Sequence, residues 1–182
     1  MKVTPLDIPE ILIIEPNVFE DERGIFFESF NLHEFIKATS LDVTFVQDNH
    51  SKSTKGVLRG LHYQMSPHAQ GKLVRVTQGE VFDVAVDLRK SSPTFGKYVS
   101  HILSAENKKQ MWIPEGFAHG FLTLSDTSDF LYKTNVPYNL KYERCILWND
   151  KTLNINWPKD IEIKLSPKDE LANSFKSCEF FL

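Results

Sequence analysis

Four residues of this chain have side chains that could together support proton transfer. His62 follows an Arg-Gly-Leu sequence, His119 follows a Pro-Glu-Gly turn, and Lys72 and Tyr132 each stand among apolar neighbours. A histidine can take a proton near neutral pH, and a tyrosine can donate one. A buried lysine can stabilise the negative oxygen that forms when a carbon next to a carbonyl loses a proton. Together these residues favour the enolisation of a carbonyl compound.

Each of these residues also has a structural interpretation when it is considered alone. His62 or His119 could be a hydrogen-bonded histidine on a half-apolar strand. Tyr132 could be a core aromatic residue, and Lys72 could be a solvated lysine at a strand edge. The occurrence of all four in one chain favours the catalytic interpretation.

The elements that must position these residues are short strands. Segments rich in aromatic and β-branched residues recur between Gly, Pro, Asn and Asp. They span 11–14, 24–30, 43–50, 57–64, 72–77, 81–89, 97–103, 110–113, 120–124, 129–135 and 143–148. Helix signals are confined to 31–37 and 166–175. The pattern predicts an all-β, cupin-type jelly-roll barrel with a few short helices.

The block 72–89 contains two alternating segments joined by a Gln-Gly-Glu turn, and we expect it to form a hairpin. Alternation divides its second half into two faces. One face holds Phe82, Val84, Val86 and Leu88, and the other holds Val81, Asp83, Ala85 and Asp87. Because the first face is purely apolar, we expect it to form the contact between two sheets.

The histidine pattern argues against a metal cofactor. A metal-binding cupin barrel usually offers a His-x-His pair, a Glu and a later His. Here the first element is His62-Tyr63-Gln64, so a metal site would have to use His62, Gln64 and His119. This is a poor ligand set for a transition metal. The pattern therefore favours a metal-free mechanism.

Three charged residues have two open interpretations each. Ser166 and Asp169 match a capping box, so the local sequence favours a purely structural Asp169. Arg23 and Arg59 each precede a glycine, where they are either surface turn residues or contacts to a phosphate. Neither GxxxxGK nor GxGxxG occurs, so a phosphorylated ligand would be held by side chains.

Length and composition limit the remaining possibilities. The 182 residues, 41% of them hydrophobic, fit a single domain over 1–182. Twenty-one basic and 24 acidic residues give a net charge of −3 without long single-sign runs, which argues against nucleic-acid or membrane binding. Cys145 and Cys178 form no metal or redox motif, and no leader sequence is apparent. We expect a reduced, cytoplasmic protein.

Several motifs occur in the order found in one known family, and they extend over about residues 3 to 175. They are Glu22-Arg23-Gly24 with Phe26 and Glu28, Gln47-Asp48-Asn49, Arg59 to Gln64, Pro114-x-Gly116-x-x-His119-Gly120-Phe121, Tyr132-Lys133-Thr134 and Glu143-Arg144. The chain resembles the dTDP-4-dehydrorhamnose 3,5-epimerase family. The resemblance implies a metal-free cupin homodimer without a cofactor. Its substrate would be dTDP-4-dehydro-6-deoxy-D-glucose, epimerised at C3 and C5 to the precursor of dTDP-L-rhamnose.

The resemblance also implies roles for individual residues. His62 is similar to the base that removes both protons and Asp169 to its orienting partner. Tyr132 is similar to the acid that returns a proton, and Lys72 to the group near the C4 enolate oxygen. Residues similar to those around the diphosphate and sugar are Arg23, Arg59, His119 and Lys168. Residues similar to those on the nucleotide side are Phe26, Glu28, Gln47, Asn49, Tyr138 and Glu143, and Asp48 is also expected to bind substrate.

In the family the early segment reaches across the dimer, which implies sites shared between two chains. The chemistry agrees with this assignment, because a 4-keto group acidifies the C–H bonds on both adjacent carbons. One base and one acid on opposite ring faces can then invert two centres without oxidation.

The sequence departs from the family pattern after Tyr132. Pro137 precedes Tyr138, Leu140 stands where proline is usual, and Cys145 stands where glycine is usual. The altered loop is expected to border the sugar, which leaves a C3-only epimerase open. A 3,4-ketoisomerase on the same dTDP-sugar and a non-catalytic sugar-binding cupin also stay open. The presence of both a histidine and a tyrosine argues against binding alone.

Overall fold

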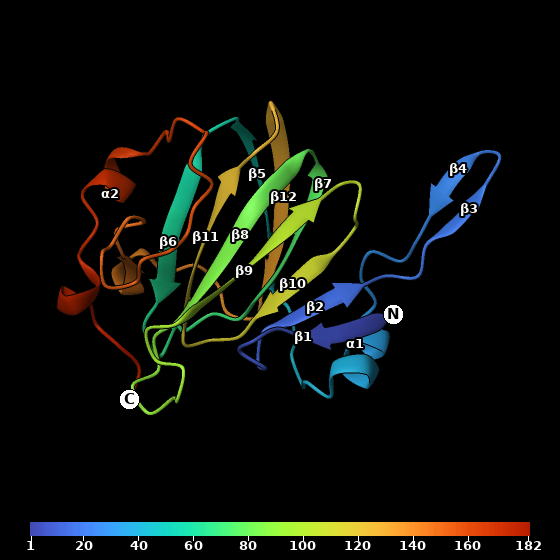
Figure 1. The fold of residues 1–182 in the computed structure, drawn as a ribbon. Coiled ribbons are helices and arrows are strands. Elements are labelled where there is room, and N and C mark those ends of the chain that lie inside the picture. Colours follow the sequence, from blue (N-terminus) through green and yellow to red (C-terminus); the bar gives the residue numbers. More distant parts are fainter.

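Two antiparallel β-sheets face each other in the computed structural model, which describes residues 1–182 (Figure 1). The six-stranded sheet has the order β1 (Lys2–Pro5), β2 (Leu12–Glu15), β10 (Gln110–Ile113), β7 (Lys72–Gln78), β12 (Thr127–Thr134) and β5 (Gln47–Thr54). The five-stranded sheet has the order β13 (Glu143–Cys145), β6 (Leu58–Gln64), β11 (Phe117–Thr123), β8 (Glu80–Asp87) and β9 (Tyr98–Ser104). The predicted all-β class is confirmed.

The remaining elements are small and lie at the margins of the sheets. They are the hairpin of β3 (Phe19–Asp21) and β4 (Gly24–Phe26), the helices α1 (Leu32–Thr39) and α2 (Pro167–Glu170), and 3-10 turns at Leu140–Tyr142 and Phe175–Ser177. The β3–β4 hairpin projects away from both sheets (Figure 1). None of the helices has the length and apolar composition needed to cross a membrane.

The second helix is shorter than the sequence predicts. The predicted start of this helix is correct, because the Ser166 side chain caps it and accepts a hydrogen bond from the backbone N–H of Asp169. The helix ends at Glu170, however, because the chain then turns to place Asn173 beside Ile146 in an isolated β-bridge.

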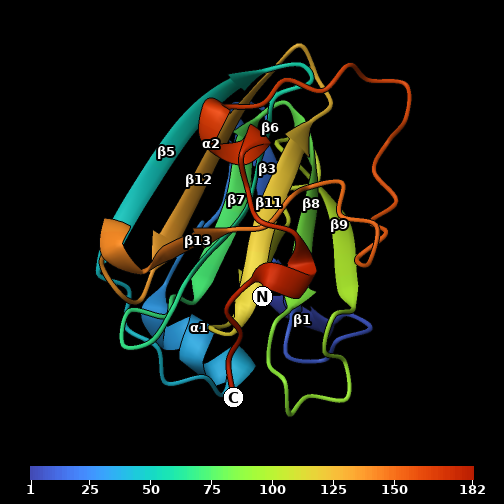
Figure 2. The same ribbon diagram turned by 90° about the vertical axis from the view of Figure 1, so that its left-hand side faces the viewer.

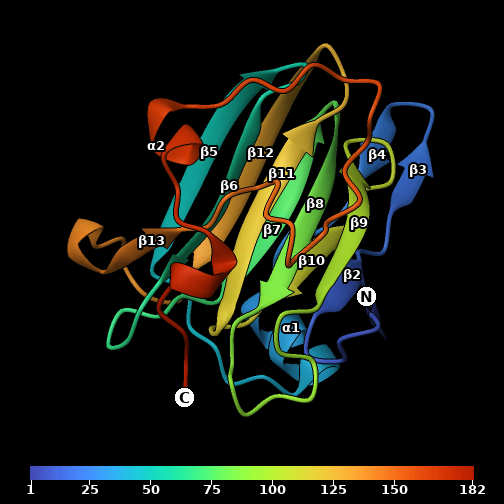
Figure 3. The ribbon, with the colours of Figure 1, turned by 60° about the vertical axis from the view of Figure 1, so that its left-hand side comes forward.

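The prediction about the two faces of β8 is wrong. The face with Val81 and Ala85 packs between the sheets, against β7 residues such as Val74. The apolar face, which includes Val84 and Val86, instead packs beneath the segment that follows β13. Figure 3 shows this segment, in orange and red, crossing the outside of the five-stranded sheet. Both faces of β8 are therefore buried, so apolarity alone could not identify the inner one.

The hairpin predicted over 72–89 is also wrong. Strands β7 and β8 lie in different sheets, each between other partners. Gly79, with φ of +74°, turns the chain from one sheet to the other. The next residue, Glu80, donates its backbone N–H to the Ser125 hydroxyl at 2.8 Å, which holds the crossing against the β11–β12 connection. The crossing places Lys72 and Asp83 on opposite walls of one interior.

A close approach of two glycines brings the histidine motifs together. Gly60 has a φ of +130°, and a Cβ added to it would lie 2.5 Å from the Cα of Gly120. Only glycines allow β6 and β11 to approach this closely. Strands β6 and β11 are neighbours in the five-stranded sheet (Figure 2). In their register His62 and His119 face each other. Both histidines are in this way fixed on rigid strands.

Candidate active site

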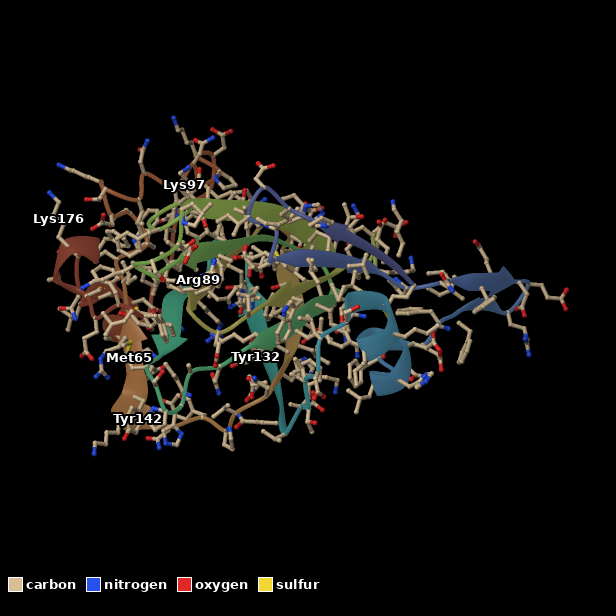
Figure 4. All side chains as sticks on the ribbon, turned by 90° about the horizontal axis from the view of Figure 1, so that it is seen from below. Met65, Arg89, Lys97, Tyr132, Tyr142 and Lys176 are labelled. Carbon is tan, nitrogen blue, oxygen red and sulfur yellow. The ribbon has the colours of Figure 1, made fainter.

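A cavity of about 370 Å³ opens between the sheets. Residues from both walls line it, and Figure 4 shows one of them, Tyr132, in the middle of the molecule seen from below. The predicted site residues that line it are His62, Lys72, Tyr132, Asp169, Arg59, His119, Tyr138, Glu143 and Lys168. All four candidate catalytic residues therefore share one cavity.

His62 and Asp169 form the shortest polar contact in this cavity. The His62 Nε2 atom lies 2.6 Å from Asp169 Oδ1, and the Asp169 side chain is 3% exposed. The other carboxylate oxygen accepts a hydrogen bond from the Ser166 hydroxyl at 2.7 Å. Asp169 is thus both the capping residue predicted from the local sequence and the partner of His62 predicted from the resemblance.

The electrostatics of this pair favour a neutral histidine beside an ionised carboxylate. Burial lowers the pKa of His62, although the hydrogen bond to Asp169 opposes this shift. Burial also acts on Asp169, but the hydrogen bonds from His62 and Ser166 hold the pKa of Asp169 below its usual value. Because the carboxylate can only accept, Nε2 donates its proton and the lone pair of the neutral ring lies on Nδ1.

Lys72 and Tyr132 supply a cation and a proton donor to the same cavity. Lys72 is 8% exposed, and its ammonium group donates to the backbone oxygen of His62 at 3.3 Å. Burial lowers the pKa of Lys72 to about 8, although Asp83 and Glu143 favour the charged form. Burial raises the pKa of Tyr132, so its hydroxyl keeps its proton at neutral pH.

His119 is held by a carboxylate that the sequence did not identify as functional. Its Nε2 lies 3.0 Å from both oxygens of Asp83, which is fully buried. Burial raises the pKa of Asp83, while the nearby His119 and Lys72 oppose the shift. The signal for Asp83 was its place among small apolar residues on one face of β8.

Ion pairs and amide contacts connect the cavity wall to the loop at 137–140. Glu143 accepts from Lys168 at 2.8 Å and from the Tyr138 hydroxyl at 3.0 Å. The Gln64 side chain accepts from the backbone of Asn139 at 2.7 Å and donates to the backbone oxygen of His68 at 2.7 Å. Gln64 therefore fixes the loop whose sequence departs from the family pattern.

The predicted residues of β5 lie beside the cavity. Gln47 accepts a hydrogen bond from the backbone of Tyr138 at 2.9 Å, and Asn49 faces Tyr132 across the β5–β12 pair. Asp48 alternates with them and forms an ion pair with Lys133 at 2.8 Å. None of the three lines the cavity itself.

Three predicted residues lie away from the cavity of their own chain. Arg23 is on the β3–β4 hairpin, where it pairs with Asp21 at 2.6 Å. Phe26 ends the same hairpin and is 69% exposed, and Glu28 follows it and accepts from Asn31 at 3.1 Å. This chain alone does not bring these residues to His62.

Cys145 adds a sulfur atom to the His62 and Asp169 pair. It is the β13 residue opposite His62 in β6, and its thiol donates to Asp169 Oδ1 at 3.6 Å. Burial raises the pKa of this thiol to about 12, so it stays protonated at neutral pH. The second cysteine, Cys178, is also free, and its thiol donates to the backbone oxygen of Ser174.

Comparisons with known proteins agree on one family. Residues 5–177 match the model of the dTDP-4-dehydrorhamnose 3,5-epimerase family. The dTDP-4-dehydrorhamnose 3,5-epimerase of Shigella flexneri is 62% identical over 182 residues, which are 100% of both chains. The enzyme of the same description from Pseudomonas aeruginosa is 58% identical over 181 residues, covering 100% of this chain and 99% of the relative.

The fold has a close counterpart among solved structures. The crystal structure of dTDP-6-deoxy-D-glucose-3,5-epimerase from Legionella pneumophila, in complex with dTDP-4-keto-L-rhamnose, is 50% identical to this chain. The two structures superpose with a TM-score of 0.94 over 98% of this chain and 94% of the other. The predicted cupin-type architecture is thereby confirmed.

Proposed function

The chain belongs to the dTDP-4-dehydrorhamnose 3,5-epimerase family, and on that premise we propose how its cavity performs the reaction. It is an isomerase, a dTDP-4-dehydrorhamnose 3,5-epimerase of dTDP-L-rhamnose biosynthesis. The observation that carries the mechanism is the meeting of His62, Asp169, Tyr132 and Lys72 around one cavity. Residues 1–182 then act together as one cupin-like epimerase domain.

His62 is the base in this proposal. Its neutral ring has one free lone pair, and the hydrogen bond to Asp169 at 2.6 Å fixes the ring and stabilises the imidazolium that forms. The 4-keto group of the sugar acidifies the C3 and C5 protons, which lie on the two carbons adjacent to it. One base can therefore remove both protons in successive steps, and no oxidation is required.

Lys72 and Tyr132 complete each proton exchange. The buried ammonium of Lys72 stabilises the negative charge that forms on the C4 oxygen in the enolate. Tyr132 returns a proton to the opposite face of the ring, because it belongs to the opposite sheet from His62. The residues needed for the chemistry thus come from the chain itself, with no cofactor.

The dTDP part of the substrate is assigned to the positively charged part of the cavity wall and to the β5 residues beside it. Arg59 and Lys168 line the cavity with positive charge, and His119, which is opposite His62 on the neighbouring strand, lines the same cavity. Such charges suit a diphosphate in the absence of a Gly-rich phosphate loop. Tyr138, Glu143 and the β5 residues Gln47, Asp48 and Asn49 are assigned to the nucleotide.

We further propose a homodimer in which the β3–β4 hairpin of each chain completes the site of the other. The hairpin projects from its own chain, and it exposes Phe19, Ile25 and Phe26 by 64%, 51% and 69%. Exposed apolar side chains of this size favour a contact surface. The contact would deliver Arg23, Phe26 and Glu28 to the partner cavity.

Mixing two inactive variants is expected to restore activity if the sites are shared. Arg23→Ala and His62→Ala chains should each have low activity. After chain exchange, half of the dimers are mixed and each has one complete site, so activity should recover to about one quarter of the wild-type value. No recovery after exchange proven by native mass spectrometry would show that Arg23 serves its own chain.

The activity of the wild-type protein is expected to fall as the pH rises through about 8. Lys72 is charged below its pKa of about 8 and neutral above it, and only the charged form stabilises the enolate oxygen. Lys72→Met should lower kcat by about 100-fold and should remove this alkaline limb. Lys97→Met, at an exposed lysine that does not line the cavity, is the matched control. An unchanged alkaline limb in Lys72→Met would assign the titration to another group.

A further inference from the structure

We propose that His62, Asp169 and Cys145 form a Zn²⁺-binding site whose occupation inhibits the epimerase. The metal-binding part of this proposal depends only on the geometry of the three side chains. The inhibition depends on the proposed role of His62 as the base.

Three elements bring three different ligand atoms to one place. Strands β6 and β13 place His62 and Cys145 opposite each other, so the two side chains project from the same face of the sheet. Helix α2 adds Asp169, and Figure 3 shows α2, β6 and β13 on the same side of the molecule. The His62 nitrogen, the Cys145 sulfur and an Asp169 oxygen all lie within 4.8 Å of one another.

The donor set and its spacing suit zinc. A thiolate sulfur, an imidazole nitrogen and a carboxylate oxygen are the three ligand types that Zn²⁺ binds in proteins. With bonds of about 2.0 to 2.3 Å, ligand atoms of a tetrahedral site lie about 3.3 to 3.7 Å apart. The distance from Cys145 Sγ to Asp169 Oδ1 is already 3.6 Å. The hydrogen bond of 2.6 Å between His62 and Asp169 would have to open by about 1 Å or less.

The surroundings allow an ion to enter and complete its coordination. His62 and Asp169 line the cavity, and the His62 side chain is 26% exposed. Cys145 is partly exposed. Coordination would release the thiol proton of Cys145, and the single ring proton of His62 would move from Nε2 to Nδ1, because zinc takes the place of the proton on each ligand atom. A water molecule from the cavity would supply the fourth ligand.

The expected inhibition follows from the proton count of an imidazole ring. A neutral ring has one N–H group and one lone pair. If zinc binds at Nε2, the ring proton must lie on Nδ1, so no lone pair is left to accept a proton from the sugar. The metal also occupies the Asp169 oxygen that orients the ring. Zinc therefore removes the base without changing the residues that are assigned to the dTDP part of the substrate.

Cobalt absorption tests binding independently of activity. Co²⁺ added to the reduced wild-type protein is expected to give a near-ultraviolet thiolate-to-cobalt band with visible bands typical of tetrahedral coordination. Cys145→Ser should lose the thiolate band, whereas Cys178→Ser should retain it. Absence of the band in the wild-type protein, or its loss in Cys178→Ser instead, would overturn the assigned site.

Zinc titration of the epimerase tests the inhibition. The Zn²⁺ concentration that half-inhibits the wild-type enzyme should be lower than the one that half-inhibits Cys145→Gly by a factor of about ten or more. The reason is that the variant lacks the thiolate ligand. Each variant is normalised to its own rate in the presence of chelator, and added chelator should restore the wild-type rate. Equal inhibition of both proteins, or activation by Zn²⁺, would overturn the proposal. The cobalt bands require no catalysis, so they test the metal site by themselves. An inactive wild-type protein would count against the proposed mechanism only.

Discussion

Replacing His62 with alanine is expected to reduce the rate of epimerisation by about 1,000-fold or more. The variant lacks the histidine that is 26% exposed and held by Asp169, whereas the other cavity histidine, His119, is only 9% exposed and is held by Asp83. The measurement is kcat at saturating substrate, followed by proton NMR of the 4-keto sugar.

A matched histidine substitution controls for general effects on folding. His50 lies on β5, is paired with Asp129 at 2.9 Å, and does not line the catalytic cavity. His50→Ala should retain kcat within about twofold of the wild-type value. A His62→Ala protein that is folded, as judged by thermal unfolding, and still epimerises at a comparable rate would assign the base to another residue.

Replacing Tyr132 with phenylalanine is expected to separate proton removal from inversion. The variant keeps His62 and Asp169 but loses the hydroxyl that returns a proton to the opposite ring face. Epimerisation should fall by about 100- to 10,000-fold. Deuterium from heavy water should still enter the substrate, because His62 can exchange its own proton with solvent and return a deuteron to the original face.

The control for this variant is a tyrosine on the outer strand β9. The Tyr98 hydroxyl accepts a hydrogen bond from the backbone of Asn156 at 3.0 Å, away from the cavity. Tyr98→Phe should therefore invert the sugar at the wild-type rate. Complete epimerisation by Tyr132→Phe would show that the hydroxyl is not the acid, and loss of all exchange would show that the two residues act in one inseparable step.

The sequence predicted those parts of the fold that depend on local patterns. Strand β10 begins and ends at the predicted residues, 110 and 113. Alternation correctly placed Lys72 beside Val74 and Val76, because successive side chains of a strand point to opposite faces. Strand β1 was missed, since its residues are mostly exposed and show no apolar alternation.

Partner strands and layers were less predictable. The segments of β7 and β8 each had the strand pattern, but nothing local shows that a Gly79 turn crosses between sheets instead of closing a hairpin. The inner face of β8 was misassigned for a related reason. The apolar residues on its outer face are covered by a segment that contains Trp157 and Phe175, about 70 to 90 residues further along the chain.

The candidate site shows the same division between local and distant information. His62 and Gln64 could be placed on one face from alternation alone. Asp169 is separated from His62 by 107 residues, and its local sequence indicated only a helix cap. The family resemblance supplied the pairing. The contact of Asp83 with His119 was not predicted, although both residues were recognised as polar groups among apolar neighbours.

One measurement tests the central claim, that the enzyme removes a proton from both carbons beside the keto group and inverts both. The wild-type protein is incubated with dTDP-4-dehydro-6-deoxy-D-glucose in heavy water, and proton NMR follows the C3 and C5 signals together with the configuration of the product. The account predicts deuterium at both carbons and a product inverted at both. Deuterium confined to C3, a product inverted at one centre only, or an absence of exchange would contradict it.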